Sequence, residues 1–362
     1  MAVIEIRNLV KRYGKTVAVN DVSFKVESGT FTVVLGPSGS GKTTLLRCVA
    51  GFEKPDAGDV AIDGVSMKDV PPRERDLAMV FQSYALFPLM TIHDNIGFPL
   101  KVRSVPATQI DSRVKEVAKL LGIEELLDKK PNQLSGGEQQ RAALGRAIVR
   151  EPKALLMDEP LTSLDTPLRA QMRTELKRIR RETNMTAIYV THDQAEALAL
   201  GDMLAIMNAG KLVEHDKPLE VYARPSNSFV AGFVGNPATN LLPATVDAAN
   251  AKNTLRVGKA TFRLDASAFE MVRQKAGSEA VIGVRPEDVR VDASKRSEGS
   301  LDVVVDTVEP LGSSLIVTTL LEGNPFKLVL PPDMLVRPGD HLWIAWEPNR
   351  MHVFQKSGDL IV

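Results

Sequence analysis

Cysteine is almost absent from this chain of 362 residues, which contains only Cys48. A single cysteine excludes an intramolecular disulfide and fits a reducing compartment. Cys48 lies among Leu45, Leu46 and Val49, a setting that favours a small buried side chain over a reactive thiol.

Long hydrophobic runs and an excess of charge of one sign are also missing. No apolar run reaches the length of about 18 residues that a membrane-spanning helix needs, and the acidic Glu5 near the start argues against a secretory signal. The 45 basic and 45 acidic residues give a net charge of zero, so strong attraction to nucleic acid or anionic lipid is not indicated. We therefore expect a cytoplasmic protein that binds no nucleic acid.

A glycine-rich stretch stands out against this ordinary composition. The apolar residues 31–35 predict a buried strand, GPSGSGKTT follows, and an apolar helical pattern comes next. This is the phosphate-binding sequence G-x-x-x-x-G-K-[ST] in its strand–loop–helix context, which favours a phosphate site over a turn that binds nothing. Lys42 is expected to neutralise the β- and γ-phosphates, and the Thr43 hydroxyl to ligate Mg²⁺. The residues expected to hold the nucleotide are Gly36, Pro37, Ser38, Gly39, Ser40, Gly41, Lys42, Thr43 and Thr44.

An aromatic residue precedes this loop. Tyr13 lies in a predicted loop between strands 3–9 and 16–26, where it can be a core aromatic or can stack on a nucleobase. Its position ahead of the phosphate loop favours stacking on adenine.

Polar side chains follow three further apolar strands, predicted over 77–81, 154–157 and 186–190. Because the carboxyl ends of strands in open α/β sheets face the ligand crevice, we expect these side chains to lie near the phosphates. Asp158 and Gln82 are expected Mg²⁺ contacts, and Glu159 can polarise a water molecule. Gln82 can instead be an ordinary loop residue and His192 a structural histidine, but their shared position favours contact with the γ-phosphate.

A second exposed helix N-terminus is predicted in LSGGEQQRAALGRAIV. Ser135 is a suitable N-cap, Gly136 and Gly137 leave backbone N–H groups open, and Glu138 lies in the first turn. Such an end can bind an anion, although a plain capped helix is the alternative.

The composition changes near residues 229–237. We expect an α/β domain over 1–235, with a helical subdomain at about 88–150, and a separate domain over 236–362. The second domain consists of short strands punctuated by turn residues, which predicts a β barrel or sandwich. Its predicted strands are 254–257, 261–264, 281–284, 301–308, 315–321, 326–330, 341–346 and 351–354.

Taken together, these residues resemble the ATP-binding cassette (ABC) ATPases over the whole chain. Six stretches match family motifs: Gly36–Thr44 the Walker A loop, Gln82 the Q-loop, Leu134–Gln140 the signature, Leu155–Asp158 Walker B, Ser163–Asp165 the D-loop and His192 the switch histidine. The resemblance implies ATP and Mg²⁺ as cofactors, with Glu159, His192 and Gln82 as catalytic residues. It also implies that Tyr13, Gln139 and Asp165 contact nucleotide. The implied fold is an α/β P-loop cassette with antiparallel β and helical subdomains, followed by an OB-like β barrel.

A narrower resemblance links the chain to ATPase subunits of bacterial carbohydrate importers. It rests on RERDLAMVFQSYALFPLMTIHDNI, YVTHDQAEAL and VIGVRPEDV. This likeness implies a homodimer at the cytoplasmic face of the inner membrane that drives two transmembrane permease subunits and, indirectly, serves a substrate-binding protein. It also implies that the C-terminal domain acts in dimerisation and regulation. A sugar or sugar derivative is the expected solute, while importers of polyamine, glycerol-phosphate and other small solutes share much of the pattern.

Two other classes of function fit less well. Too few residues separate Lys42 from Ser135 for the long coiled coil of chromosome-maintenance ATPases. A small-molecule kinase would leave Leu134–Gln140 and His192 without a role.

Overall fold

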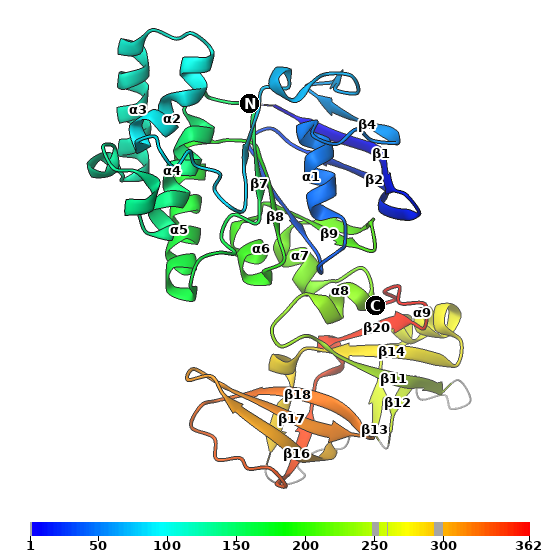
Figure 1. The fold of residues 1–362 in the computed structure, drawn as a ribbon. Helices are drawn as coiled ribbons and strands as arrows, with labels where there is room; N and C mark the ends of the chain where they lie inside the picture. The colour runs from blue at the N-terminus through cyan, green and yellow to red at the C-terminus, as the bar shows by residue number, and fades with distance from the viewer. Residues whose placement is uncertain (1, 248–252, 259, 293–299) are drawn as a thin grey trace. The chain divides into compact units, whose positions relative to one another are not determined.

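The computed structural model describes residues 2–247, 253–258, 260–292 and 300–362 (Figure 1). The chain divides into two compact units, Met1–Leu219 and Glu220–Val362. Each unit has its own sheets and its own apolar core, and each is described by itself below.

The first unit is built around a six-stranded, mostly parallel sheet. Its strands are β3 (Phe31–Leu35), β6 (Leu77–Val80), β7 (Ala154–Asp158), β8 (Ala187–Thr191), β9 (Met203–Asn208) and β10 (Lys211–Asp216). The strand order is β10-β9-β3-β8-β7-β6, and β10 runs antiparallel to β9. Every side chain of β3 and β8 is buried, as expected for the centre of a parallel sheet covered on both faces.

A four-stranded antiparallel sheet supplies another wall of the core. It contains β1 (Ile4–Tyr13), β2 (Thr16–Val26), β4 (Ala57–Ile62) and β5 (Val65–Ser66), in the order β2-β1-β4-β5. Its buried side chains share one apolar cluster with helix α1 (Lys42–Ala50) and with the parallel sheet. Tyr13 ends β1 instead of lying in the predicted loop, because the pairing with β2 continues through Arg12 and Tyr13.

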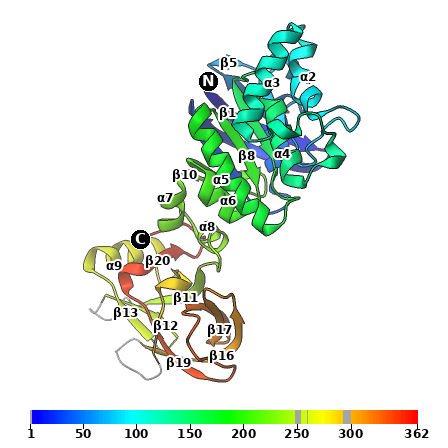
Figure 2. The same cartoon turned by 90° about the vertical axis from the view of Figure 1, so that its left-hand side faces the viewer.

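Five helices complete the part of this unit that positions the site. They are α2 (Ile92–Val102), α3 (Ala107–Leu121), α4 (Gly136–Ile148), α5 (Thr166–Thr183) and α6 (Gln194–Leu200). Helices α2, α3 and α4 lie together as a group in both views (Figures 1 and 2), and in Figure 1 strands β7 and β8 separate them from α1. Gly145 lets α4 pack closely, since a Cβ there would lie 3.1 Å from Leu121 and 3.2 Å from Ile96. Among the described residues, no helix is long and apolar enough to cross a membrane.

A buried arginine holds the C-terminal end of α1. Arg75 is 6% exposed, and burial lowers the pKa of its guanidinium. The guanidinium donates to main-chain oxygens only, those of Val70 (2.9 Å), Cys48 (2.9 Å), Val49 (2.8 Å) and Met67 (2.8 Å). A cation is favourable beside the carbonyl oxygens that end a helix. Gly51 leaves room for it, because a Cβ at Gly51 would lie 2.5 Å from Nε of Arg75.

The second unit contains two five-stranded antiparallel sheets, ordered β13-β12-β11-β14-β20 and β15-β19-β16-β17-β18. The strands of the first sheet are β11 (Asn240–Asp247), β12 (Thr254–Val257), β13 (Ala260–Arg263), β14 (Glu279–Val284) and β20 (Met351–Gln355). Those of the second are β15 (Arg290–Asp292), β16 (Leu301–Pro310), β17 (Leu315–Leu321), β18 (Asn324–Leu330) and β19 (His341–Ala345). The inner faces of the two sheets form one apolar core, in which Trp346 stacks on Phe262 and Phe326 at ring distances of 4.6 and 5.8 Å.

Three helices accompany these strands. Helices α7 (Pro218–Ala223) and α8 (Ser228–Phe233) precede β11, and α9 (Ala266–Ala276) follows β13. The buried Arg285 lies over the Tyr222 ring, 3.7 Å from its centroid, and donates to the main-chain oxygens of Tyr222 and Val234. The predicted α/β cassette with a C-terminal β domain is confirmed, with α9 as an added helix. The division into 1–235 and 236–362 stays a prediction.

Candidate functional site

The carboxyl ends of four parallel strands meet at one edge of the six-stranded sheet. In register, Leu35 lies opposite Thr191, Asp158 opposite Val190, and Val80 opposite Met157. The predicted site residues that follow these strands are Gly36, Gln82, Asp158, Glu159 and His192. The sheet therefore brings to one edge most of the residues that the sequence marks for phosphate chemistry.

The loop after β3 needs its glycines. A Cβ at Gly36 would lie 2.3 Å from the main-chain oxygen of Met207, and one at Gly41 would lie 2.1 Å from that of Ala18. Gly39 and Gly41 also have φ values of 78° and 98°, which residues with a side chain rarely adopt. Pro37 has no N–H group, and the N–H of Ser40 donates to the main-chain oxygen of Pro37 at 3.2 Å, so the remaining loop residues are the ones that can present N–H groups to an anion.

Lys42, the first residue of α1, is buried and turned back onto the loop. Its Nζ donates to the main-chain oxygens of Gly36 and Pro37, both at 2.9 Å. Burial lowers the pKa of Lys42, while the nearby carboxylates Glu159 and Asp158 act in the opposite direction. A buried ammonium with only neutral acceptors within hydrogen-bond distance is prepared to pair with an added anion.

The next residue, Thr43, reaches the end of β7. Its hydroxyl donates to Oδ1 of Asp158 at 2.9 Å. Burial raises the pKa of Asp158, and the hydrogen bond from Thr43 partly offsets this effect. Two oxygen ligands of the kind that Mg²⁺ prefers thus lie together beside the phosphate loop.

Glu159 adopts a left-handed backbone conformation with φ of 45°, which is uncommon for a residue with a side chain. Its Oε2 lies 3.1 Å from Nδ1 of His192 and accepts a hydrogen bond from the Thr162 hydroxyl at 3.2 Å. Glu159 and His192, which the sequence places at the ends of neighbouring strands, therefore lie within hydrogen-bond distance of each other. Sequence reasoning did not select Thr162, although a hydroxyl in the turn after Glu159 was a visible signal.

Tyr13 and Gln82 lie outside this hydrogen-bonded group. The Tyr13 ring is 45% exposed, and Nζ of Lys11 lies 5.2 Å from its centroid. Burial raises the pKa of Tyr13, with a smaller contribution from its hydrogen bond to Glu53. The open ring face suits stacking better than a core position does. Gln82 is exposed and, within the described residues, is not hydrogen-bonded to the other site residues.

The second predicted anion site is a well-formed helix end. The Ser135 hydroxyl accepts the N–H of Glu138 at 3.4 Å, and Oε2 of Glu138 accepts the N–H of Ser135 at 2.7 Å, which is a capping box. Gly137 is buried, and a Cβ there would lie 2.8 Å from Leu168. The Gln139 amide donates to main-chain oxygens of Pro131 and Leu134, so its N–H₂ group is already engaged.

No hydrogen bond or ion pair joins Ser135, Gly136, Gly137 or Gln139 to loop 36–44 in the described part of the chain. Asp165 is exposed and caps α5, because its Oδ1 accepts the N–H of Leu168 at 2.9 Å. In the described residues, the helix end at Ser135 and the turn at Asp165 are therefore not hydrogen-bonded to the phosphate loop of the same chain.

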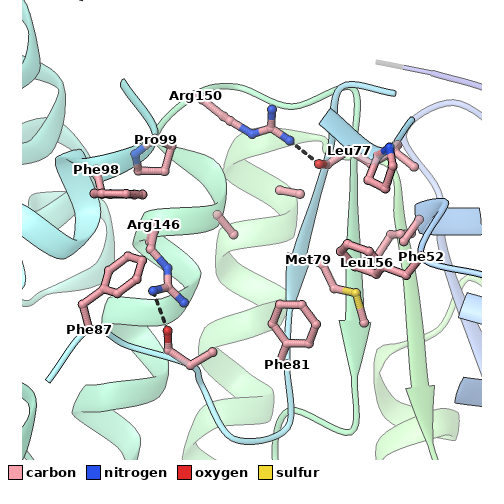
Figure 3. Close-up of a pocket in the computed structure, with 15 residues that line it drawn as sticks. Phe52, Leu77, Met79, Phe81, Phe87, Phe98, Pro99, Arg146, Arg150 and Leu156 are labelled. Atoms are coloured by element: carbon pink, nitrogen blue, oxygen red, sulfur yellow. Dashed lines mark hydrogen bonds between the residues drawn. The ribbon is translucent and has the colours of Figure 1, made fainter. Parts of the chain in front are cut away.

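An apolar cleft of about 460 Å³ lies beside β6 (Figure 3). Phe52, Phe81, Phe87 and Phe98 are among its lining residues. The apolar run 84–90 after Gln82 predicts an exposed patch of Tyr84, Leu86, Phe87 and Leu89, and the structure corrects this prediction at one position. Tyr84 is 8% exposed, because its hydroxyl is within hydrogen-bond distance of the Ser163 hydroxyl and its ring is packed inward.

Two residues that the sequence did not mark shape this cleft. Arg146 donates to the main-chain oxygens of Ala85 and Tyr84 at 2.7 and 2.8 Å, and its guanidinium lies 5.4 Å from the Phe87 ring centroid. The fully buried Asn95 accepts the N–H of Phe87 at 2.8 Å and donates back to its carbonyl oxygen at 3.1 Å. In the sequence, each of these two residues is a polar side chain among the apolar residues of its helix, α2 for Asn95 and α4 for Arg146, and this pattern could have marked both.

Comparison with known proteins finds similar proteins over nearly the whole chain. A protein-family model described as ABC transporter matches residues 19–162, one described as MalK OB fold domain matches 235–289, and one described as TOBE domain matches 282–354. The trehalose/maltose import ATP-binding protein MalK of Thermococcus litoralis is 45% identical, covering 99% of this chain and 98% of that protein. The sn-glycerol-3-phosphate import ATP-binding protein UgpC 1 of Rhizobium johnstonii is 44% identical, covering 100% and 96%. The oligosaccharides import ATP-binding protein MsmX of Bacillus subtilis is 40% identical, covering 99% of each.

Solved structures resemble the first unit. The ATP-binding cassette MJ0796, a dimer in a post-hydrolysis state with ADP and Pi, has a TM-score of 0.53 and 31% identity, covering 59% of this chain and 98% of that one. The cbiO1 protein of Clostridium perfringens, part of the ABC transporter complex cbiONQ, has a TM-score of 0.57 and 28% identity, covering 61% and 90%.

Proposed function

The chain belongs to the ATP-binding cassette transporter ATPases with MalK-type OB and TOBE domains, and from this premise we propose that it is the energy-coupling subunit of a solute importer. The observation that carries the proposal is the edge of the parallel sheet. There a buried Lys42 and Thr43 at the start of α1 lie with Asp158, Glu159 and His192 at the ends of the neighbouring strands, in a Thr43–Asp158 pair and a Glu159–His192 pair. This arrangement can bind a nucleoside triphosphate and activate water against its terminal phosphate.

Each residue has a distinct part in hydrolysis of ATP to ADP and phosphate. The N–H groups of the loop residues other than Pro37, together with those at the start of α1, hold the β- and γ-phosphates, and Lys42 turns from the loop carbonyls to their oxygens. Glu159 accepts a proton from the attacking water, and His192 orients Glu159 and contacts the γ-phosphate. Tyr13 stacks on adenine.

A magnesium ion fits the residues present. Thr43 and Asp158 offer hard oxygen ligands at hydrogen-bond distance from each other, and a cation would favour the carboxylate that burial disfavours. Gln82 supplies a further amide oxygen. When bound, the ion neutralises charge on the phosphates.

Two chains are needed for complete nucleotide sites. Among the described residues, no hydrogen bond or ion pair joins the Ser135 helix end to the phosphate loop, although this end is itself well capped. Two copies arranged head to tail would let Ser135, Gly136, Gly137, Gln139 and Asp165 of one chain face the nucleotide of the other. The dimeric state of the MJ0796 cassette supports this arrangement.

The apolar cleft beside β6 is the proposed docking site for a helix of a permease subunit. Two residues that line it, Phe81 and Phe87, flank Gln82 in the sequence. A movement of Gln82 with the nucleotide state can therefore reach a partner docked in the cleft. Its apolar walls suit a helix with an apolar face. Two permease subunits would bind the two copies and hold them at the cytoplasmic face of the membrane, with a substrate-binding protein on the other side.

A sugar or sugar derivative is the proposed solute. The names of the MalK and MsmX relatives support it, and that of the UgpC relative supports glycerol-phosphate as the alternative. The test is ATPase activity of the chain co-purified with its permeases in lipid vesicles, measured with the cognate binding protein and a panel of solutes. Stimulation by one sugar class supports the proposal. ATPase activity that nucleic acid stimulates, or that no solute stimulates in the presence of the permeases and the binding protein, contradicts it.

A further inference from the structure

Glu196 is a buried carboxylate that the chemistry proposed above does not use. Its side chain is 2% exposed, and it lies in α6, just after His192. Oε2 of Glu196 accepts the Tyr189 hydroxyl at 2.8 Å and the Thr191 hydroxyl at 2.7 Å. Burial raises the pKa of Glu196, and these two hydrogen bonds oppose that effect. Burial of a carboxylate costs free energy unless neighbouring donors form hydrogen bonds with it. The residues that donate to Glu196 therefore indicate what it does in the structure.

The partners of Glu196 include both neighbours of His192. The Thr191 hydroxyl donates to Glu196 and also accepts the N–H of Asp193 at 3.0 Å. Oδ1 of Asp193 in turn caps α6 by accepting the N–H of Glu196 at 3.0 Å. The His192 side chain itself is 47% exposed. Its position is therefore set mainly by the two residues beside it, which Glu196 holds.

Arg169 links this group to the turn before α5. Its Nη1 donates to Oδ2 of Asp193 at 3.2 Å, and its Nη2 donates to the main-chain oxygen of Leu164 at 3.1 Å. Its Nε lies 3.9 Å from Oε1 of Glu196. One guanidinium thus donates hydrogen bonds to the residue after His192 and to the peptide just before Asp165, and it lies beside the buried carboxylate as an ion pair without a hydrogen bond to it. The planar fork of arginine can make these two hydrogen bonds and face Glu196 in one fixed geometry, which the point charge of lysine cannot.

We propose that Arg169 and Glu196 are a positioning pair that couples the turn 163–165 to His192. When a second chain closes on Asp165, the shift of the turn reaches Asp193 through Arg169, and the group around Glu196 places His192 against Glu159. The inference rests on the proposed role of His192 in hydrolysis. Neither Arg169 nor Glu196 touches the nucleotide, so both act on the rate through His192.

The primary test is Glu196→Gln in the assembled transporter. The amide keeps the shape and an acceptor oxygen but removes the charge beside Arg169. We expect kcat for ATP to fall about tenfold while KM changes less than about threefold. Arg169→Lys, which retains the charge, should fall between the wild type and Arg169→Ala. The matched control is Arg178→Gln on the same helix, whose exposed pairs with Glu175 and Glu182 lie outside this group, and it should leave kcat unchanged.

A double-variant measurement separates positioning from a general loss of stability. In a His192→Ala background the positioned group is missing, so Glu196→Gln should change the single-turnover rate by less than about twofold. A full tenfold loss in that background, or no loss in the wild-type background, overturns the proposal. If Glu196→Gln lowers the thermal midpoint or the ATP affinity of the isolated chain, Arg169→Lys is measured in the wild-type and His192→Ala backgrounds instead. The proposal then requires a loss of rate in the wild-type background only. A His192→Ala chain that hydrolyses at the full rate would refute the role of His192 itself, which is a different outcome.

Discussion

The phenolic oxygen of Tyr84 lies 2.6 Å from the hydroxyl oxygen of Ser163. Tyr84 precedes Ala85, which lines the apolar cleft, and Ser163 belongs to the turn that carries Asp165. This hydrogen bond therefore joins the wall of the proposed docking cleft to the surface that we propose faces the other chain.

Tyr84→Phe should weaken the communication between these two surfaces. The change keeps the ring and removes the hydroxyl, so ATP affinity should stay unchanged and stability should fall by about 1 kcal/mol. Solute-stimulated ATPase activity should fall by about threefold or more, the size of a typical coupling energy, while basal activity is retained. Equal loss of basal and stimulated rates would show that the hydrogen bond does not carry the signal.

Glu159→Gln should separate binding from chemistry. An amide cannot accept the proton of the attacking water, so phosphate release by the assembled transporter should fall by about 100-fold or more. ATP should still bind, and the two-chain form should accumulate in size-exclusion chromatography. Glu151→Gln, at an exposed ion pair with Arg113, is the control, and near-normal turnover of Glu159→Gln would remove Glu159 from its role.

Lys42→Ala should instead lose ATP affinity, because the phosphate loses a charged partner.

Ser135→Arg tests whether the nucleotide sites are shared between two chains. The bulky side chain would obstruct the α4 helix end, so dimer formation with ATP and turnover should be lost while the isolated chain binds ATP normally. Ser112→Arg, an exposed position on α3, is the matched control and should change neither. Loss of ATP binding by isolated Ser135→Arg chains would mean that the helix end serves the nucleotide of its own chain.

Phe87→Lys tests the docking cleft. The new ammonium would lie in an apolar wall close to Arg146, whose guanidinium is 5.4 Å from the Phe87 ring in the native chain. Co-purification with the permease subunits should fall several-fold, while ATP affinity is unchanged. Val65→Lys places the same charge at an exposed apolar residue of β5 and should have no effect. Unchanged transport by Phe87→Lys would locate the docking surface elsewhere.

The stability of the fold should acquire an alkaline limit from Cys48. Burial raises the pKa of Cys48 to about 11, whereas a cysteine in an unfolded chain has a pKa of about 8.5. Folding thus favours the protonated thiol, and this contribution is complete below about pH 8.5 and is lost as the pH rises to about 11. In urea unfolding from pH 8 to 11, the wild type should lose up to about 3 kcal/mol more than Cys48→Ala. Parallel curves for the two proteins would contradict the shift.

Local sequence patterns were enough to predict the strand, loop and helix around the glycine-rich stretch. The strand expected over 31–35 is β3 with the same bounds, because a short apolar run followed by glycines leaves few other structures. The meeting of Asp158 and His192 at one edge was also predictable, since the carboxyl ends of parallel strands share an edge.

Features that depend on distant residues were not predictable. Tyr84 was expected at the surface, and it is buried because Ser163 supplies a partner from another part of the chain. The task of Glu196 is invisible without Arg169, which comes from a different helix. Helix α9 was missed for another reason. Asp265 caps it, and Ala268, Phe269 and Val272 form its buried face, but these signals are short and lie among strands.

The hydrogen bonds of Arg75 at the end of α1 predict which nearby positions can vary among related proteins. Its acceptors are main-chain oxygens, which every residue type supplies, so residues 48, 49, 67 and 70 can drift to any side chain that fits the core without loss of these bonds. Arg75 has no such latitude, because lysine offers one ammonium in place of a planar fork. Gly51 is equally constrained, since any Cβ would meet that fork. In related proteins we therefore expect substitutions at the four acceptor positions, and we expect Arg75 and Gly51 to stay unchanged.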